Sequence, residues 1–140
     1  MNKKKHILLV EDNRDDVDLT IMALEKCDIV NEVKVARDGD EALSMLYDTE
    51  EEPELPVLVL LDINMPKING FEVLKEIRGN ERTRRLPVVI LTSSREVQDI
   101  HRGYDLGANS YIRKPVGFES FVEAVRNLGR YWLKWNESPV

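Results

Sequence analysis

The sequence predicts an α/β fold, a doubly wound (βα)5 sandwich in which one five-stranded parallel sheet is flanked by five helices. Apolar runs alternate with segments of helical periodicity along the chain, which is the pattern of successive βα units. Val57 to Leu61 are five consecutive aliphatic residues with no polar alternation, as expected for a parallel strand buried on both faces. A length of 140 residues and a hydrophobic content of 42% suit one domain with one core.

Each predicted strand is a short apolar run, and each predicted helix is a segment whose apolar residues recur on one side. The strands are expected, in order, at residues 6–10, 33–36, 57–61, 87–91 and 110–113. The helices are expected at residues 15–27, 41–47, 71–78, 96–106 and 118–135. Asp40 is a suitable cap for the second helix. Pro87 is tolerated because it opens its strand, and Gly79 and Gly107 end the third and fourth helices.

Composition excludes several classes of protein. Acidic residues outnumber basic ones by 26 to 20, and the net charge is −6, which argues against a nucleic-acid partner. Cys27 is the one cysteine, so no internal disulfide can form, and a reducing compartment fits. The apolar run at residues 7–10 is too short for a secretory segment, and no run approaches the roughly 20 residues that span a bilayer. We therefore expect a soluble, cytoplasmic protein with no membrane partner.

Polar residues able to do chemistry follow four of the five predicted strands. Glu11 and Asp12 follow the first strand, and Asp62 follows the third. Thr92 stands at the end of the fourth strand, and Lys114 follows the fifth. The carboxyl ends of adjacent parallel strands lie side by side, and ligands bind in the crevice there. We therefore expect these five residues to converge on one pocket.

The acidic residues suit a metal ion. Adjacent carboxylates repel each other, so Glu11 and Asp12 favour a nearby cation such as Mg²⁺, although they could equally cap the helix that follows, as could Asp15 or Asp16. Asp62 could be a third metal ligand, a nucleophile towards phosphorus, or both.

The residues around these acids suit a phosphoryl group. Turns on either side of Pro66 and at Asn69-Gly70 leave the Asn64 carbonyl free to face a ligand. The Thr92 hydroxyl can hydrogen-bond a phosphoryl oxygen, and Lys114 can pair with that oxygen or with the carboxylate.

Together these strings resemble the receiver domain of two-component response regulators, over about residues 5–128. The resemblance rests on the acidic pair, on the run Leu61-Asp62-Ile63-Asn64-Met65-Pro66 with Gly70, on Thr92-Ser93 and on Lys114-Pro115. The intervals match as well, because 30 residues separate positions 62 and 92, and 22 separate positions 92 and 114. The resemblance implies a flavodoxin-like fold and a single receiver domain spanning residues 1–140. Its core would be about residues 5–128, with a C-terminal helix extension at about residues 129–140.

The resemblance also implies a role for each site residue. Asp62 would accept a phosphoryl group from a sensor histidine kinase, and Thr92 and Lys114 would contact that group. The metal ligands for Mg²⁺ would be Asp12 directly, Glu11 through a coordinated water, Asp62, and the backbone carbonyl of Asn64.

The implied output is a change of surface rather than a reaction product. Thr92 and Tyr111 would form the switch, although Tyr111 taken alone is an ordinary strand aromatic. The protein would not be an enzyme beyond limited self-catalysed phosphorylation and dephosphorylation. With no attached output domain expected, it would signal to an unknown downstream protein.

Two further features resemble a subgroup of stand-alone regulators that partner bacterial phytochrome-type histidine kinases. They are the string Asn13-Arg14-Asp15-Asp16 and the aromatic segment at residues 131–135. Within that segment, Trp132 and Trp135 either cover the core or form a contact in a homodimer. The sequence leaves both readings open.

Other functions fit less well. A phosphohydrolase of the haloacid-dehalogenase kind would carry a second acid where this chain has Asn64, and an amide cannot act as a general acid. An interaction domain that has lost phosphorylation would not need every site residue to be present. Neither glycine-rich phosphate-binding string of nucleotide-binding proteins occurs.

Overall fold

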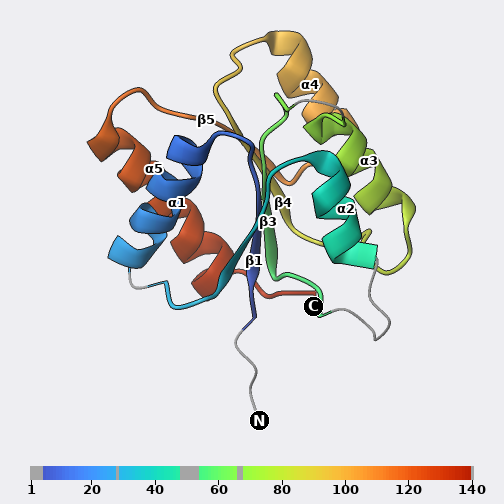
Figure 1. The fold of residues 1–140 in the computed structure, drawn as a ribbon, viewed down its shortest axis with the longest axis horizontal. Helices are drawn as coiled ribbons and strands as arrows, with labels where there is room; N and C mark the ends of the chain where they lie inside the picture. Colours follow the sequence, from blue (N-terminus) through green and yellow to red (C-terminus); the bar gives the residue numbers. More distant parts are fainter. Residues whose placement is uncertain (1–4, 28, 48–53, 66–67, 140) are drawn as a thin grey trace.

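The fold is a single parallel sheet with helices on both faces, and it confirms the predicted fold class (Figure 1). The computed structural model describes residues 5–27, 29–47, 54–65 and 68–139. Residues 1–4 of the predicted domain, and Pro66 of the loop after the third strand, lie outside the described residues. No helix in these ranges is both long enough and apolar enough to cross a membrane.

The sheet has the strand order β2-β1-β3-β4-β5, and all neighbouring strands are parallel. The strands are β1 (Ile7–Val10), β2 (Val33–Ala36), β3 (Leu58–Leu61), β4 (Val88–Thr92) and β5 (Ser110–Arg113). Val10 lies opposite both Ala36 and Leu61, so β2, β1 and β3 end at the same level. The order reverses between β1 and β3, which is where open α/β sheets bind ligands.

Helices cover the two faces of the sheet unequally. Figure 1 shows α1 and α5 on one face, with α2 and α3 on the other. The helices are α1 (Arg14–Lys26), α2 (Gly39–Tyr47), α3 (Gly70–Gly79), α4 (Val97–Asp105) and α5 (Phe118–Arg130). Gly103 of α4 packs against Ile90 and Tyr111, whose side chains face the α2–α3 layer.

Side chains of alternate strand residues pack into two separate hydrophobic cores, one on each face of the sheet. In β3, Leu58 and Leu60 pack under α1 and α5, whereas Val59 and Leu61 pack under α2 and α3. All four side chains are fully buried, and each contributes about 1.5–3 kcal/mol by leaving water. The unbroken aliphatic run that predicted this strand is therefore required, because both of its faces are covered.

Three helices, α1, α2 and α3, begin one or two residues earlier than the sequence suggests. Asn13, rather than Asp15 or Asp16, caps α1, and its Oδ1 accepts a hydrogen bond of 3.0 Å from the Asp16 backbone N. In α2 the corresponding acceptor is Asp38, whose Oδ1 is 2.8 Å from the Glu41 N, so the expected cap at Asp40 is wrong. Short polar side chains are near-equivalent caps, and their crowding around the starts of α1 and α2 makes the sequence ambiguous.

The last helix changes its winding near its end. α5 stops at Arg130, and Tyr131–Trp135 continue as a π-helical turn in which the Asn136 N donates to the Tyr131 O at 2.7 Å. Within this turn the two tryptophans have different surroundings. Trp132 packs against the core under α1 and α5, whereas Trp135 is 78% exposed.

Arg78, near the end of α3, joins three segments at the end of the sheet away from the carboxyl termini of the strands. Its guanidinium donates to the backbone O of Leu86 at 2.7 Å and of Gly107 at 2.8 Å. It also donates to Asn109 Oδ1 at 2.9 Å, and the same oxygen accepts from the Val88 N. Burial lowers the pKa of this guanidinium. The end of α3, the start of β4 and the turn after α4 are thus held together.

Candidate functional site

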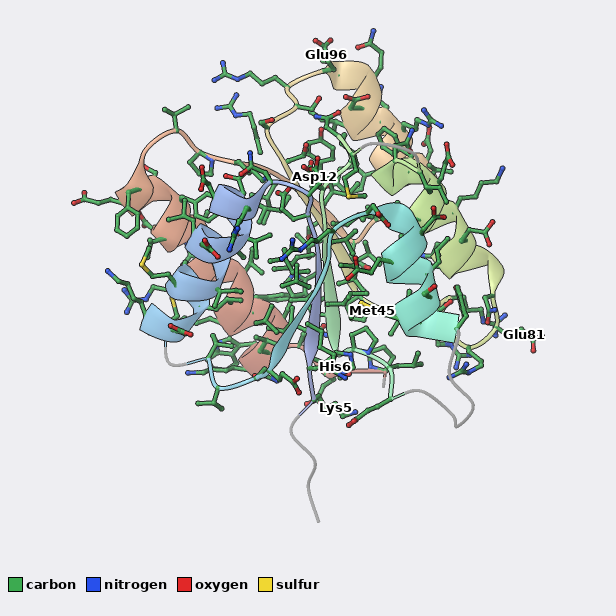
Figure 2. All side chains as sticks on the ribbon, viewed as in Figure 1. Lys5, His6, Asp12, Met45, Glu81 and Glu96 are labelled. Atoms are coloured by element: carbon green, nitrogen blue, oxygen red, sulfur yellow. The ribbon has the colours of Figure 1, made fainter. Side chains whose placement is uncertain are left out.

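The predicted site residues gather where the strands end. Figure 2 shows Asp12 at that end of the sheet, with His6 and Lys5 at the opposite end. The sheet hydrogen bonds continue one residue past the strands, because the Glu11 N donates to the Ala36 O at 2.9 Å and the Asp62 N donates to the Val10 O at 3.0 Å. These bonds fix the backbone from which both carboxylates extend.

Three carboxylates form a compact cluster. Glu11, Asp12 and Asp62 each offer an oxygen, and these oxygens all lie within 4.8 Å of one another. Glu11 is 3% exposed and Asp62 is 7% exposed, while Asp12 faces solvent. The Asn64 backbone N donates to Asp62 Oδ1 at 3.3 Å, which orients that carboxylate. Oxygen ligands of this kind, with one side open to water, suit a small hard divalent cation.

The electrostatics of Glu11 support the same conclusion. Burial, together with the nearby Asp62 charge, raises the pKa of the Glu11 carboxyl to about 7, although the hydrogen bond from Lys114 acts in the opposite direction. A single lysine therefore does not offset all the negative charge of the cluster near neutral pH. A bound divalent cation would favour the charged form of Glu11.

Lys114 is the cation that the structure places in this cluster. Its Nζ contacts Glu11 Oε1, lies 2.8 Å from Asp16 Oδ2, and lies 3.8 Å from Asp62 Oδ2. Burial alone would lower the pKa of the ammonium, but the contacts with Asp16 and Glu11 and the charge of Asp62 raise it above its usual value. The ammonium is therefore charged over the physiological pH range.

Asp16 is the site residue that the sequence did not single out. From the sequence alone, Asp16 is only a possible helix cap. In the structure its carboxylate accepts a hydrogen bond from Lys114, 98 positions away. No local signal pointed to this contact, because Asp12 and its neighbouring acid lie outside α1 and the lysine is remote in the sequence.

Thr92 and Tyr111 are linked to the cluster less directly. Thr92 is fully buried, and its backbone O accepts from the Lys114 N at 2.6 Å. Its Oγ1 accepts from the Ser94 N at 3.4 Å. The Tyr111 hydroxyl donates to the Ser94 O at 3.2 Å, while Ser94 Oγ donates to Asp99 Oδ2 at 2.6 Å. A chain of contacts thus runs from Thr92 through Ser94 to α4 and to Tyr111.

Gly70 keeps the loop after Asp62 close to α3. Its N donates to the Ile63 O at 3.2 Å. A Cβ added at Gly70 would collide with the Asp62 carbonyl oxygen and lie 2.7 Å from the Ile63 Cα. The glycine is therefore required by a close backbone approach, directly behind the Asp62 carboxylate.

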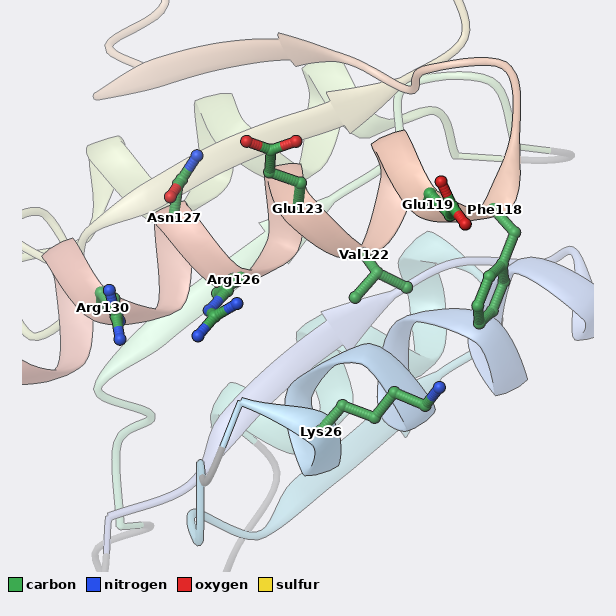
Figure 3. A pocket seen from close by; sticks show the side chains of 8 residues that line it. All are labelled: Lys26, Phe118, Glu119, Val122, Glu123, Arg126, Asn127 and Arg130. Atoms are coloured by element: carbon green, nitrogen blue, oxygen red, sulfur yellow. The ribbon is translucent and has the colours of Figure 1, made fainter.

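The chemistry does not lie in the groove between α1 and α5. This groove has a volume of about 640 Å³, and in it the Lys26 side chain points towards Phe118 (Figure 3). Its lining carries both signs of charge and no group of converging carboxylates. A smaller hollow of about 140 Å³ is bounded by Glu11, Asp12 and Arg37. We assign the site to the converging carboxylates at the strand ends, of which Glu11 and Asp12 also border this smaller hollow.

A parallel sheet whose strand ends gather three carboxylates and a buried lysine defines a phosphoacceptor of two-component signalling. The family described as "Response regulator receiver domain" matches residues 7–126, and the chain belongs to this family. As a receiver it takes a phosphoryl group from a sensor histidine kinase and signals through a change of its interaction surface. Receiver domains bind a divalent metal at this acidic pocket.

Among individual proteins, the chain is similar to the response regulator Rcp1 of Synechocystis sp. (strain ATCC 27184 / PCC 6803 / Kazusa), with 38% identity over 136 residues, or 95% of this chain and 92% of Rcp1. The Mn²⁺-bound structure of Rcp1 has a TM-score of 0.89 at 36% identity, covering 97% of this chain and 99% of that one.

Two further relatives extend the comparison. The structure of the phosphorylated cyanobacterial phytochrome response regulator RcpA has a TM-score of 0.92 at 38% identity and covers 99% of this chain and 100% of that one. The probable methanogenesis regulatory protein FilR2 of Methanothrix harundinacea (strain 6Ac) is 42% identical over 134 residues, or 95% of this chain and 86% of FilR2.

Proposed function

We propose that Asp62 is the phosphoryl acceptor of this receiver and that the metal beside it is Mg²⁺. The observation that carries the proposal is the cluster itself, in which a buried Asp62 carboxylate lies among two further acids and within 3.8 Å of the Lys114 ammonium. Asp12, Asp62 and the Asn64 backbone carbonyl would hold the metal directly, and Glu11 would hold it through a water.

The phosphoryl group passes from a kinase histidine to Asp62 in one displacement at phosphorus. An oxygen of the Asp62 carboxylate attacks the phosphorus of the kinase's phosphohistidine, a P–O bond forms, and the P–N bond breaks with the electron pair returning to the imidazole. Lys114 and the Thr92 hydroxyl donate hydrogen bonds to the transferred oxygens, which carry the negative charge. When bound, Mg²⁺ neutralises part of that charge and keeps the acids from repelling the incoming group.

We propose that the switch runs through Ser94. A phosphoryl oxygen that draws the Thr92 hydroxyl towards Asp62 removes the acceptor of the Ser94 N. Because Ser94 also contacts Tyr111 and Asp99, the start of α4 moves with it. A local charge change thereby alters the surface formed by α4, β5 and α5. The protein acts on its own phosphoryl group only, by limited uptake and hydrolysis, and is otherwise not an enzyme.

The setting of the protein completes the proposal. The chain is one receiver domain at residues 1–140, with a core at about residues 5–128 and a helix extension at about residues 129–140. It works in the cytoplasm and passes its signal to an unknown downstream protein. A phytochrome-type kinase is supported by the similarity to RcpA. A homodimer is supported by the exposed Trp135.

Intact-mass spectrometry tests the acceptor. The wild type, Asp62→Asn and the exposed-acid control Asp105→Asn are incubated with acetyl phosphate and Mg²⁺. One phosphoryl adduct is expected on the wild type and on the control. None is expected on Asp62→Asn, or on any protein after chelation of Mg²⁺. An adduct that persists on Asp62→Asn would show that another residue is the acceptor. No adduct on the wild type, with a second receiver labelled in parallel, would remove the proposal.

A further inference from the structure

The Lys114 ammonium is shared among carboxylates in an unequal way. An ammonium has three hydrogen atoms to donate. Hydrogen bonds run from Nζ to Glu11 Oε1 and to Asp16 Oδ2, the second at 2.8 Å. Asp62 Oδ2, at 3.8 Å, is beyond hydrogen-bond distance. In this state the lysine is bound to two acids, and neither of them is the proposed phosphoryl acceptor.

Asp16 is held firmly enough to fix the lysine. Its backbone N donates to the Asn13 side chain at 3.0 Å, and its backbone O accepts from Thr20 Oγ1 at 2.7 Å. Both bonds lie in the first two turns of α1, so the carboxylate extends from a fixed backbone. Lys114 is anchored as well, because its N donates to the Thr92 O at 2.6 Å.

We infer that Asp16 is a positioning residue that holds the Lys114 ammonium beyond hydrogen-bond distance of Asp62, and so lowers the affinity of the site for a phosphoryl group. The inference rests on the proposed function, in which Asp62 accepts that group. A phosphoryl group on Asp62 draws the ammonium by its charged oxygens. Asp16 competes for the same ammonium through a contact that is partly shielded from solvent, since the Lys114 side chain is 10% exposed and the Asp16 side chain 33% exposed.

The neighbouring acid Asp15 provides a matched comparison. It lies in the same turn of α1, carries the same charge and is exposed. Among the described residues Lys114 pairs with Glu11, Asp16 and Asp62, and not with Asp15. A change at Asp15 alters the local charge without releasing the lysine, whereas the same change at Asp16 does both.

The first experiment measures the affinity for beryllium trifluoride, a mimic of the phosphoryl group, by NMR titration of the Mg²⁺-loaded protein. Asp16→Asn is expected to bind about three- to tenfold more tightly than the wild type, because the lysine is free to reach the new anion. Asp15→Asn is expected to stay within about twofold of the wild type. Asp16→Glu, which restores the charge, is expected to return the affinity to near the wild-type value.

The second experiment needs neither metal nor anion. An ammonium held by two carboxylates exchanges its protons slowly, so Lys114 is expected to give a side-chain ¹H–¹⁵N signal at low temperature. The signal is assigned by its absence in Lys114→Arg. It should persist in Asp15→Asn and be lost in Asp16→Asn, which is isosteric and retains the backbone hydrogen bonds of Asp16. Asp16→Ala is the second variant if the first does not fold.

The outcomes separate the inference from the proposed function. If the wild type binds the anion and Asp16→Asn matches Asp15→Asn, or binds more weakly, the inference is wrong and the acceptor proposal stands. If the wild type binds no more anion than Asp62→Asn does, the acceptor proposal fails, and the inference fails with it. Tighter binding by Asp16→Asn, together with loss of the ammonium signal, supports the inference.

Discussion

At the scale of single residues, His6 shows how burial sets a charge state at the end of β1 away from the site. The side chain is buried, and burial lowers the pKa of its imidazole. The positive charge of Lys34 lowers that pKa further, and Glu54 and Glu32 act against both. The folded protein therefore favours the neutral imidazole. As the pH falls below the ordinary value of about 6.5, the unfolded chain takes up the proton first.

It follows that His6 costs stability in mild acid. The contribution of His6 to the free energy of unfolding should fall between about pH 7 and pH 5.5, by at most about 1.4 kcal/mol per pH unit, whereas the raised pKa of Glu11 acts in the opposite sense in all proteins compared. In urea denaturation, His6→Gln should therefore gain stability relative to the wild type as the pH falls through this range, and His101→Gln, which removes an exposed histidine, should keep the wild-type pH dependence. Equal slopes for all three proteins would contradict this account.

Residue types and strand ends made most of the site predictable. Glu11, Asp12 and Asp62 lie together because parallel strands end at one level, and that much follows from alternating apolar and helical segments. The contact between Asp16 and Lys114 could not be read in the same way, because it depends on how α1 is rotated against the sheet. That rotation is set by the packing of side chains that are far apart in the chain.

At the scale of elements, the link between β3 and α3 depends on the absence of one side chain. Gly70→Ala would press a methyl group against the backbone of Asp62 and Ile63. The expected cost is about 1–3 kcal/mol of stability, together with slower phosphorylation by acetyl phosphate, since the displaced backbone carries the Asp62 carboxylate. Thermal denaturation and intact-mass kinetics measure the two effects.

Gly79 is the matched control for this prediction, at the other end of α3. A Cβ added there would meet no atom within 4 Å. Gly79→Ala should therefore be neutral or stabilising by about 0.5 kcal/mol, because alanine favours the helix, and it should leave phosphorylation unchanged. If both variants lose the same stability, the close backbone approach does not explain the cost at Gly70.

Element boundaries were the less predictable part of the fold. The strands are found within one residue of their expected ends, because each is an apolar run stopped by a polar residue. The predicted first residues of α1, α2, α3 and α4 were wrong by one or two positions, because several adjacent residues can cap a helix equally well. The π-helical turn at Tyr131–Trp135 has no local sequence signal, and there the expected straight helix was wrong.

At the scale of the whole molecule, the π-helical turn assigns different surroundings to the two tryptophans. Trp132 contributes to the core under α1 and α5, and Trp135 faces solvent. The two alternatives that the sequence left open for this pair are thus divided between its members: Trp132 covers the core, and Trp135 is left available for the proposed homodimer.

Trp135→Ala is expected to shift the protein towards the monomer in size-exclusion chromatography with light scattering, with little change in thermal stability. Trp132→Ala is expected to cost about 1–3 kcal/mol of stability through lost packing. Val97→Ala removes an exposed apolar side chain from α4 and tests the other exposed face. A loss of dimer in Val97→Ala but not in Trp135→Ala would place the interface on α4. If the wild type and all three variants are monomeric, the proposal of a homodimer is wrong.

The hydrogen bonds that Arg78 donates to Leu86, Gly107 and Asn109 have a mechanical consequence for α4. They fix Gly107, just behind the last turn of the helix, while the first turn meets Ser94 through Asp99. Nine residues give the helix a length of about 13 Å. The helix is therefore fixed at its last turn and joined to the Ser94 segment at its first turn. A small rotation about Gly107 displaces Val97, at the start of the helix, further than any later residue of the helix, so a shift of Ser94 is largest at that end of the α4 surface.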